Sequence, residues 1–147
     1  MTDISNVKKA LDEKGVYVST TSGVSMMPML RDRRDTIVVK PATQRLKKYD
    51  VALYKRGDSY VLHRVIKVLP DEYVIRGDNC IAKEFGIKDE DILGVLVEFY
   101  RGERHIKVSE RSYRAYSAFI CAFHPFVSLS LRMKAFFRLR SDKKKAR

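Results

Sequence analysis

The segment YDVALYKRGDSYVLHRVIKVLPDEYVIRGDN, residues 49–79, decides the fold of this chain. It holds three runs rich in β-branched and aromatic residues, a composition that is typical of β-strands. These runs are residues 49–55, 59–69 and 72–76. The tripeptide RGD at 56–58 and the dipeptide PD at 70–71 separate the runs, and both are turn-forming sequences. The segment therefore predicts antiparallel strands joined by short turns.

The flanking sequence extends this pattern in both directions. Three further runs of the same composition are residues 16–20, 36–40 and 92–101. Residues 5–14 suit a short helix, which Ser5 would cap and Gly15 would end. Strands of about ten residues must bend or carry a bulge in a small sheet. We therefore expect a mainly β (α+β) fold: a compact, bent antiparallel β-domain with a short N-terminal helix and C-terminal helices.

The composition excludes several classes of protein. A length of 147 residues suits one domain, and a hydrophobic content of 45% excludes a wholly disordered chain. Two cysteines, Cys80 and Cys121, are too few for a multi-disulfide scaffold or a four-cysteine zinc site. Cys121 and His124 have no second ligand pair, so neither a metal nor another cofactor is expected. Residues 1–14 contain no apolar run, and no signal peptide or N-terminal membrane anchor is expected.

Positive charge is concentrated toward the C-terminal end. Residues 101–147 hold 13 Lys and Arg against 3 Asp and Glu, which accounts for +10 of the formal net charge of +12. Residues 1–100 are therefore close to neutral. We divide the chain into a short helix at 1–14, a β-rich domain at 15–108 and a basic, hydrophobic helical tail at 109–147. Such a tail points to a polyanionic surface, either nucleic acid or anionic lipid.

The pattern of the tail favours lipid. Residues 115–131 carry no formal charge, and 17 residues are the lower limit for a membrane span. At helical spacing, one face collects Phe126, Leu129, Met133, Phe136 and Phe137. We expect a membrane-associated protein whose residues 111–147 contact an anionic membrane surface, and we do not expect nucleic acid as a partner. A transmembrane span, or a helix packed on its own domain or on a partner, are the alternatives.

The densest functional signal is TSGVSMMPML, residues 21–30. Ser25 stands between a glycine turn and a Met-x-Pro segment, where a bend would project its hydroxyl group and leave backbone N–H groups unpaired. The amides of Val24 and Ser25 can then face a developing oxyanion. By itself, a serine in a glycine-bounded loop is most often a turn residue. The segments that follow it in the chain decide between these two interpretations.

Three further segments follow the serine motif in order: YDVALYK, YVLHRVIKV and RGDN. Together the four resemble the ordered boxes of the type I signal peptidase superfamily, which includes the self-cleaving repressor proteases of the SOS response. The resemblance covers roughly residues 20–100. Its order and spacing are more specific than any one box.

The resemblance implies a catalytic site. Ser25 sits where the family has its nucleophile. His63 sits where bacterial signal peptidases and the repressors have a lysine general base, and a histidine there is similar to the endoplasmic-reticulum, archaeal and sporulation-type branch. Asp78 matches the Gly-Asp-Asn box that supplies the acidic residue of that branch. The implied function is a serine endopeptidase that cleaves a precursor peptide or signal-peptide-like substrate through an acyl-enzyme.

These residue types suit that chemistry independently of the resemblance. A histidine can take the proton of a serine hydroxyl near neutral pH, and an acid on its other ring nitrogen fixes the tautomer. The motif departs from the signal peptidases because Val24 separates Gly23 from Ser25, as in the self-cleaving repressors. We therefore favour backbone amides over the Ser22 hydroxyl as oxyanion donors. The candidate oxyanion and substrate-binding residues are Ser22, Val24 and Met26.

Other interpretations of the same residues are open. His63 can be a structural histidine of a strand, and Asp78 a turn residue, with Asp50 and Asp58 as the other candidate acids. A pair of Cys80 with His63 is conceivable, although nothing resembles a cysteine-protease motif. The alternative functions are a repressor-like regulatory binding module and a catalytically silent scaffold of a membrane complex.

Overall fold

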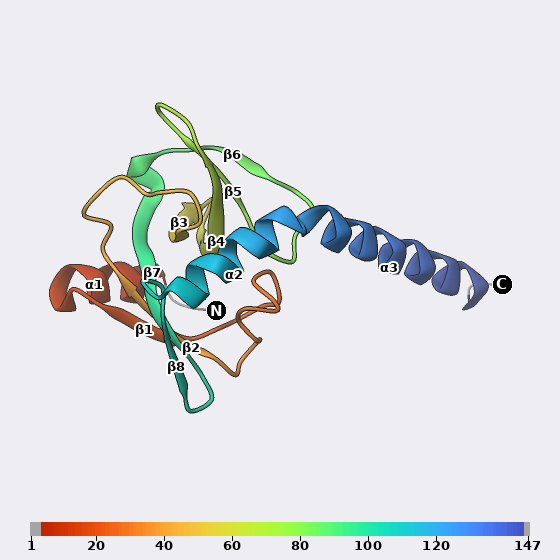
Figure 1. Ribbon diagram of the computed structural model, residues 1–147, viewed down its shortest axis with the longest axis horizontal. Coiled ribbons are helices and arrows are strands. Elements are labelled where there is room, and N and C mark those ends of the chain that lie inside the picture. The colour runs from red at the N-terminus through yellow and green to blue at the C-terminus, as the bar shows by residue number, and fades with distance from the viewer. Residues whose placement is uncertain (1–3, 146–147) are drawn as a thin grey trace.

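The computed structural model describes residues 4–145, with side chains for residues 6–138. The helices are α1 (Ile4–Lys14), the short 3-10 helix η1 (Asp89–Asp91), α2 (Arg111–Ala122) and α3 (His124–Lys145). The strands are β1 (Tyr17–Thr20), β2 (Thr36–Lys40), β3 (Val51–Arg56), β4 (Ser59–Val68), β5 (Tyr73–Arg76), β6 (Glu84–Ile87), β7 (Ile92–Arg101) and β8 (Arg104–Lys107). The expected fold class is confirmed: mainly β, with one helix before the strands and two after them (Figure 1).

The strands of the described chain form one curled antiparallel sheet. Their order is β1-β2-β7-β3-β4-β5-β6, and β8 pairs with β7 beside this series. β3 and β4 form a hairpin around the RGD turn, where Gly57 takes a φ of 58° that glycine adopts without steric cost. The hairpin register sets Ala52 opposite His63 and so fixes the position of the histidine in the sheet.

The two ten-residue strands are irregular, as expected from their length. The register of β4 on β5 shifts between Val65 and Lys67, and β7 shifts against both β2 and β3. Where β7 passes β2, a Cβ atom on Gly94 would lie 2.6 Å from the carbonyl oxygen of Lys40, so this approach requires glycine. Such irregularities bend strands and increase their twist, which suits the curl of the sheet.

The two C-terminal helices relate differently to the sheet. α2 runs along the body and buries Tyr113, Ser117 and Ile120, whereas α3 extends away from it (Figure 1). The tail expected at 109–147 therefore has two parts: its first helix belongs to the packed body, and the second projects. Among the residues described, no helix combines the length and the apolar composition that a membrane span requires.

The six runs recognised in the sequence include neither β8 nor β6, and β6 is the strand that follows the Gly-Asp-Asn segment. It pairs with β5, with Ile87 opposite Tyr73 and Glu84 opposite Ile75. Its sequence, EFGI, has only four residues and includes Gly86 at a φ of 73°. It therefore lacks the alternating pattern by which strands are recognised. Its pairing returns the chain to the sheet after the Gly-Asp-Asn segment.

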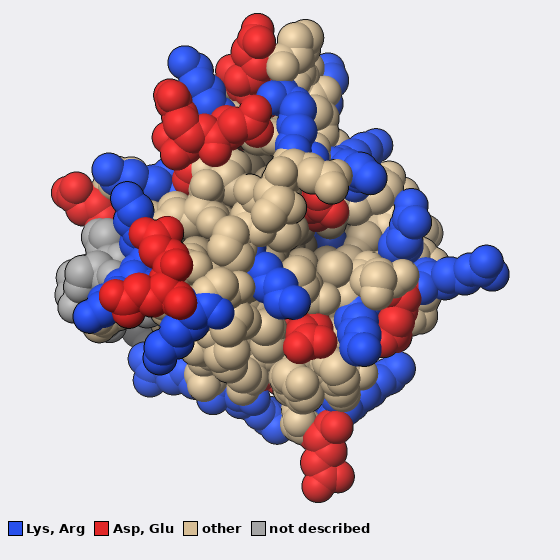
Figure 2. All heavy atoms as spheres, turned by 90° about the vertical axis from the view of Figure 1, so that its left-hand side faces the viewer, with Lys and Arg blue, Asp and Glu red and all other residues tan. Residues whose placement is uncertain are grey.

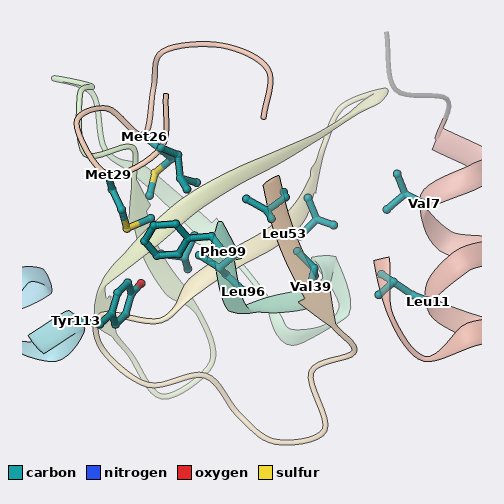
Figure 3. Close-up of a cluster of buried hydrophobic side chains, with 12 residues drawn as sticks. Val7, Leu11, Met26, Met29, Val39, Leu53, Leu96, Phe99 and Tyr113 are labelled. Carbon is teal, nitrogen blue, oxygen red and sulfur yellow. The ribbon is translucent and has the colours of Figure 1, made fainter. Parts of the chain in front are cut away.

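A core of buried apolar side chains joins the sheet to both of its covering helices. Figure 3 labels nine of its members: Val7, Leu11, Met26, Met29, Val39, Leu53, Leu96, Phe99 and Tyr113. Met26 and Met29 enter this core from the loop between β1 and β2. Burying a side chain of this size contributes about 1.5–3 kcal/mol. The loop that carries Ser25 is therefore anchored in the core directly after the serine.

Candidate active site

The loop at residues 21–35 carries Ser25 and is closed at its base by a buried carboxylate. The two oxygens of Asp35 accept hydrogen bonds from the backbone amide and the guanidinium of Arg31 at 2.6 to 3.2 Å. The Thr21 amide donates to the Asp35 carbonyl at 2.9 Å. Burial raises the pKa of Asp35, but the hydrogen bonds from Arg31 outweigh it and hold the net pKa below its usual value. These bonds tie the two ends of the loop together.

Ser25 lies in a turn of this loop, as its sequence predicts. The Met27 amide donates to the Val24 carbonyl at 3.1 Å, and Gly23 takes a φ of 92°. The Asn79 amide donates to the Ser25 carbonyl at 2.8 Å. The serine motif and the Gly-Asp-Asn segment, which are far apart in the sequence, therefore meet at Ser25.

A pocket of about 320 Å³ opens beside this turn. Its lining includes Ser22, Ser25, Met26, Arg56, His63 and Cys80. The expected nucleophile, Ser25, and the expected base, His63, thus face one pocket. Within the described part of the chain, no hydrogen bond joins these two side chains. Catalytic hydrogen bonds often tighten only when a substrate is bound.

The Nε2 atom of His63 is turned toward the serine turn. A Cβ atom on Gly77 would lie 3.0 Å from His63 Nε2 and 2.7 Å from the carbonyl oxygen of Ser25. The imidazole and the backbone of the serine turn therefore approach one another across Gly77. Any larger residue at this position would have to displace one of them.

The other ring nitrogen of His63 lies against a carboxylate. Nδ1 is 3.2 Å from Glu84 Oε1 and 3.1 Å from the Tyr54 hydroxyl, and Arg56 Nη1 donates to the same Glu84 oxygen at 3.1 Å. With Glu84 ionised, Nδ1 carries the ring proton and donates it to the carboxylate. Nε2 is then the unprotonated nitrogen on the side of the serine turn, which is the tautomer that a general base requires.

The surroundings of His63 keep its imidazole neutral at pH 7. The residue is only 4% exposed, and burial lowers the pKa of the imidazole below 6.5. Glu84 raises this pKa and Arg56 lowers it, and the net direction remains downward. The ring is therefore free to accept a proton at neutral pH. Burial, with a hydrogen bond to Glu84, raises the pKa of the Tyr54 phenol, which stays a neutral hydroxyl.

Asp78 does not take the position expected from the sequence. Its two carboxylate oxygens accept hydrogen bonds from Nε and Nη2 of Arg64, both at 2.7 Å. Arg64 follows His63 on β4, and successive side chains of a strand point to opposite faces. Asp78 is paired on the Arg64 face and, within the described residues, has no hydrogen bond to His63. The carboxylate that contacts the imidazole belongs to Glu84 instead.

The sequence did not single out Glu84, because the pairing of β6 with β5 is what brings this residue to His63. Glu84 stands six residues after Asp78, at the first position of β6. The β5–β6 register sets it opposite Ile75, and from there its side chain reaches His63 of β4. A four-residue strand that contains glycine gives no periodic signal. The only available sign was an acidic residue a short distance beyond the Gly-Asp-Asn segment.

The amides expected to face an oxyanion are unpaired. In the described chain the N–H groups of Val24 and Ser25 donate no hydrogen bond, whereas the Gly23 amide donates to a neighbouring aspartate at 2.7 Å. Ser22 and the buried Met26 line the pocket. The Val24 side chain is 53% exposed, and only the backbone of this residue is suited to an oxyanion role.

Cys80 is the second potential nucleophile at this pocket. Its Sγ would lie 2.7 Å from a Cβ atom on Gly77, on the same side as His63 Nε2. Burial raises the pKa of the Cys80 thiol, and the nearby charge of Glu84 adds to this effect. The thiol therefore stays protonated at neutral pH, and the protonated form is a poor nucleophile.

The remaining sequence candidates lie elsewhere. An oxygen of Asp50 accepts a hydrogen bond from the Lys47 amide at 2.8 Å, and Asp58 is exposed in the β3–β4 turn. The Cys80 carbonyl accepts a hydrogen bond from Nε2 of His124 at 2.8 Å. Across the described residues, no group of three His, Cys, Asp or Glu side chains could hold a metal ion.

Comparison with known proteins assigns no family to this chain. No protein-family model matches it, and a search of curated proteins finds no match. Its function is therefore argued from the pocket and from the residues that line it.

Proposed function

We propose that this protein is a serine endopeptidase with Ser25 as nucleophile, His63 as general base and Glu84 as the acid that orients the base. One observation carries the proposal: His63 lines the pocket of Ser25, with Nε2 toward the serine turn and Nδ1 on a carboxylate. This order of groups makes a serine hydroxyl nucleophilic at neutral pH. The resemblance to the type I signal peptidase superfamily supports the same reaction.

The reaction has two halves. Nε2 of His63 accepts the proton of the Ser25 hydroxyl while Oγ attacks the carbonyl carbon of the scissile bond, and the amides of Val24 and Ser25 stabilise the resulting oxyanion. The imidazolium gives its proton to the leaving amine, and an acyl ester remains on Ser25. A water molecule that loses a proton to His63 then attacks the ester, and the imidazolium returns that proton to Ser25 Oγ as the acid product leaves. Glu84 stabilises the imidazolium in both halves.

The pocket favours a peptide substrate in an extended conformation. β4 pairs with β5 only from Arg64 onward, and in the described chain no strand covers that edge at residues 59–63. Tyr60, Val61 and Leu62 line the pocket along this stretch. A substrate backbone can add to an open edge as a further strand. We infer an extended protein or peptide precursor as substrate, and the resemblance implies small side chains near the cleaved bond.

The decisive experiment incubates the purified protein with a library of precursor peptides and detects new termini by mass spectrometry. Ser25→Ala and His63→Ala should each lower the rate of cleavage by about 10²-fold or more. Cys80→Ser is the matched control, because it changes a pocket-lining group that has no role in the proposed reaction. Cleavage at the full rate by Ser25→Ala would refute the proposal, and loss confined to Cys80→Ser would assign the reaction to the thiol.

A further inference from the structure

The C-terminal helices and the residue that joins them carry more than half of the large apolar side chains that are exposed among the described residues. Of the thirteen large apolar side chains that are exposed among the described residues, six belong to α2 and α3, and a seventh belongs to Phe123, which joins the two helices. These are Phe119, Phe123, Phe126, Leu129, Met133, Phe136 and Phe137, each between 47% and 68% exposed. We call this set the aromatic face. Such a concentration on two consecutive helices of a small protein marks an interaction surface.

The aromatic face is continuous across the junction of the two helices. The rings of Phe119 and Phe123 stack with centroids 4.2 Å apart, and the ring centroids of Phe123 and Phe126 are 5.9 Å apart. From Phe126 onward, its members fall within an arc of about 100° at 3.6 residues per turn. α3 projects away from the sheet, so the body of the described chain does not cover this arc (Figure 1).

The same helix is strongly cationic. The sequence of α3 contains seven Lys or Arg and one Asp. Arg132, Lys134 and Arg138 lie outside the apolar arc, beside it or on the opposite side of the helix. By contrast, basic and acidic side chains are interspersed on the side of the molecule turned away from α3 (Figure 2). An apolar stripe with flanking cations is the pattern of a helix that lies in a membrane interface.

We propose that the aromatic face docks on an anionic lipid bilayer, with α3 lying along the bilayer surface. The phosphate backbone of a nucleic acid would neutralise the cations but would leave the phenylalanine rings in water. A second copy of the chain would cover the rings but would bring two strongly cationic helices together. An anionic bilayer satisfies both features, because its headgroups attract the cations and its acyl region accepts the rings.

This docking would place the bilayer beside the candidate pocket. His124 is the first residue of α3, and its Nε2 donates to the carbonyl of Cys80, which lines the pocket. The ring is fixed from its other side by the Ser128 hydroxyl, 3.0 Å from Nδ1. α3 therefore starts next to a residue that lines the pocket, and a bilayer bound along α3 would lie near that residue.

The test measures binding of the full chain to vesicles by co-sedimentation. The protein carries Ser25→Ala, so that the result does not depend on the proposed peptidase activity. We expect binding to vesicles of phosphatidylglycerol and phosphatidylcholine, and at least about tenfold weaker binding to phosphatidylcholine alone or in 1 M salt. Met133→Asp is compared with Ala135→Asp, which makes the same change in charge about 200° around the helix.

Met133→Asp should bind about tenfold more weakly than Ala135→Asp, because only Met133 inserts into the bilayer. Phe137→Asp repeats the test on the same face, and circular dichroism checks that each variant keeps its helices. Equal affinities of the two aspartate variants, or no binding to the anionic vesicles, would overturn the proposal. Binding to duplex DNA without binding to vesicles would also overturn it. The same holds if the protein does not bind vesicles but self-associates, and Met133→Asp abolishes this self-association.

Discussion

Nδ1 of His63 lies 3.2 Å from Oε1 of Glu84, although the two residues belong to strands that are not neighbours in the sequence. The same oxygen accepts a hydrogen bond from Arg56 at 3.1 Å, which holds the carboxylate in place. The contact orients the imidazole and leaves Nε2 free on the side of Ser25.

Glu84→Gln should lower kcat by about 10² to 10⁴-fold with little change in KM, because the amide cannot stabilise the imidazolium. The substitution should also lower the pKa of His63, because it removes the negative charge of Glu84, which raises this pKa. A histidine titration by NMR measures this second effect without any substrate. Asp58→Asn, in an exposed turn, is the control and should change neither quantity. An unchanged His63 pKa together with full activity would remove Glu84 from the site.

The pH dependence of kcat/KM should have its acidic limb below pH 6.5. The general base is active when unprotonated, and burial lowers the pKa of His63, so the active form persists to a lower pH than for an exposed histidine. A rate profile from pH 4 to pH 9 on a peptide substrate measures the midpoint. A midpoint above 6.5 would contradict the burial that the structure assigns to this ring.

Gly77→Ala should damage the active site more than the fold. The new methyl group would meet the Ser25 carbonyl at 2.7 Å and His63 Nε2 at 3.0 Å, so the serine turn and the imidazole must move apart. A displacement of about 1 Å can cost about 10²-fold in rate. Gly94→Ala is the matched control, because its methyl group would clash with β2 instead.

The two glycine variants are compared by activity per folded molecule and by urea denaturation. Gly94→Ala should lower the free energy of unfolding and keep its activity per folded molecule. Equal activity losses in both variants would show that Gly77 acts only through stability.

Asp78→Ala should lower the free energy of unfolding by about 3–5 kcal/mol, because it leaves the guanidinium of Arg64 buried without a counter-charge. Arg64 is fully buried and also donates to Ser117 of α2 at 2.8 Å, so the docking of this helix should weaken as well. Urea denaturation followed by far-UV circular dichroism measures the loss. Asp58→Ala, in the exposed turn, should remain within about 0.5 kcal/mol of the unchanged protein. A similarly small effect of Asp78→Ala would show that the pair is dispensable.

Much of the fold was predictable because its signals are local. Both ends of the strands at residues 36–40 and 92–101 were predicted correctly, since their runs of β-branched and aromatic residues end where the composition changes. The turn at Ser25 follows from the glycine before it and the Met-x-Pro segment after it. β6 was missed because four residues with a glycine carry no period. The packing of α2 on the body was only one of the alternatives for the tail, because a basic helix with Arg111 and Arg114 gives no sign of what its apolar side covers.

The sequence by itself determined six of the eight strands of the described chain, the turns between them, and that Ser25 and His63 were the residues to examine. Only the tertiary structure decided which acid contacts the histidine. Asp78 and Glu84 are both acidic residues that follow β5, and the Gly-Asp-Asn motif had favoured Asp78. Side-chain alternation along β4 points Arg64 and His63 to opposite faces, so Asp78 neutralises the buried arginine. The pairing of β6 with β5 carries Glu84 to the other face, against the imidazole, because strand register is set by contacts between distant segments.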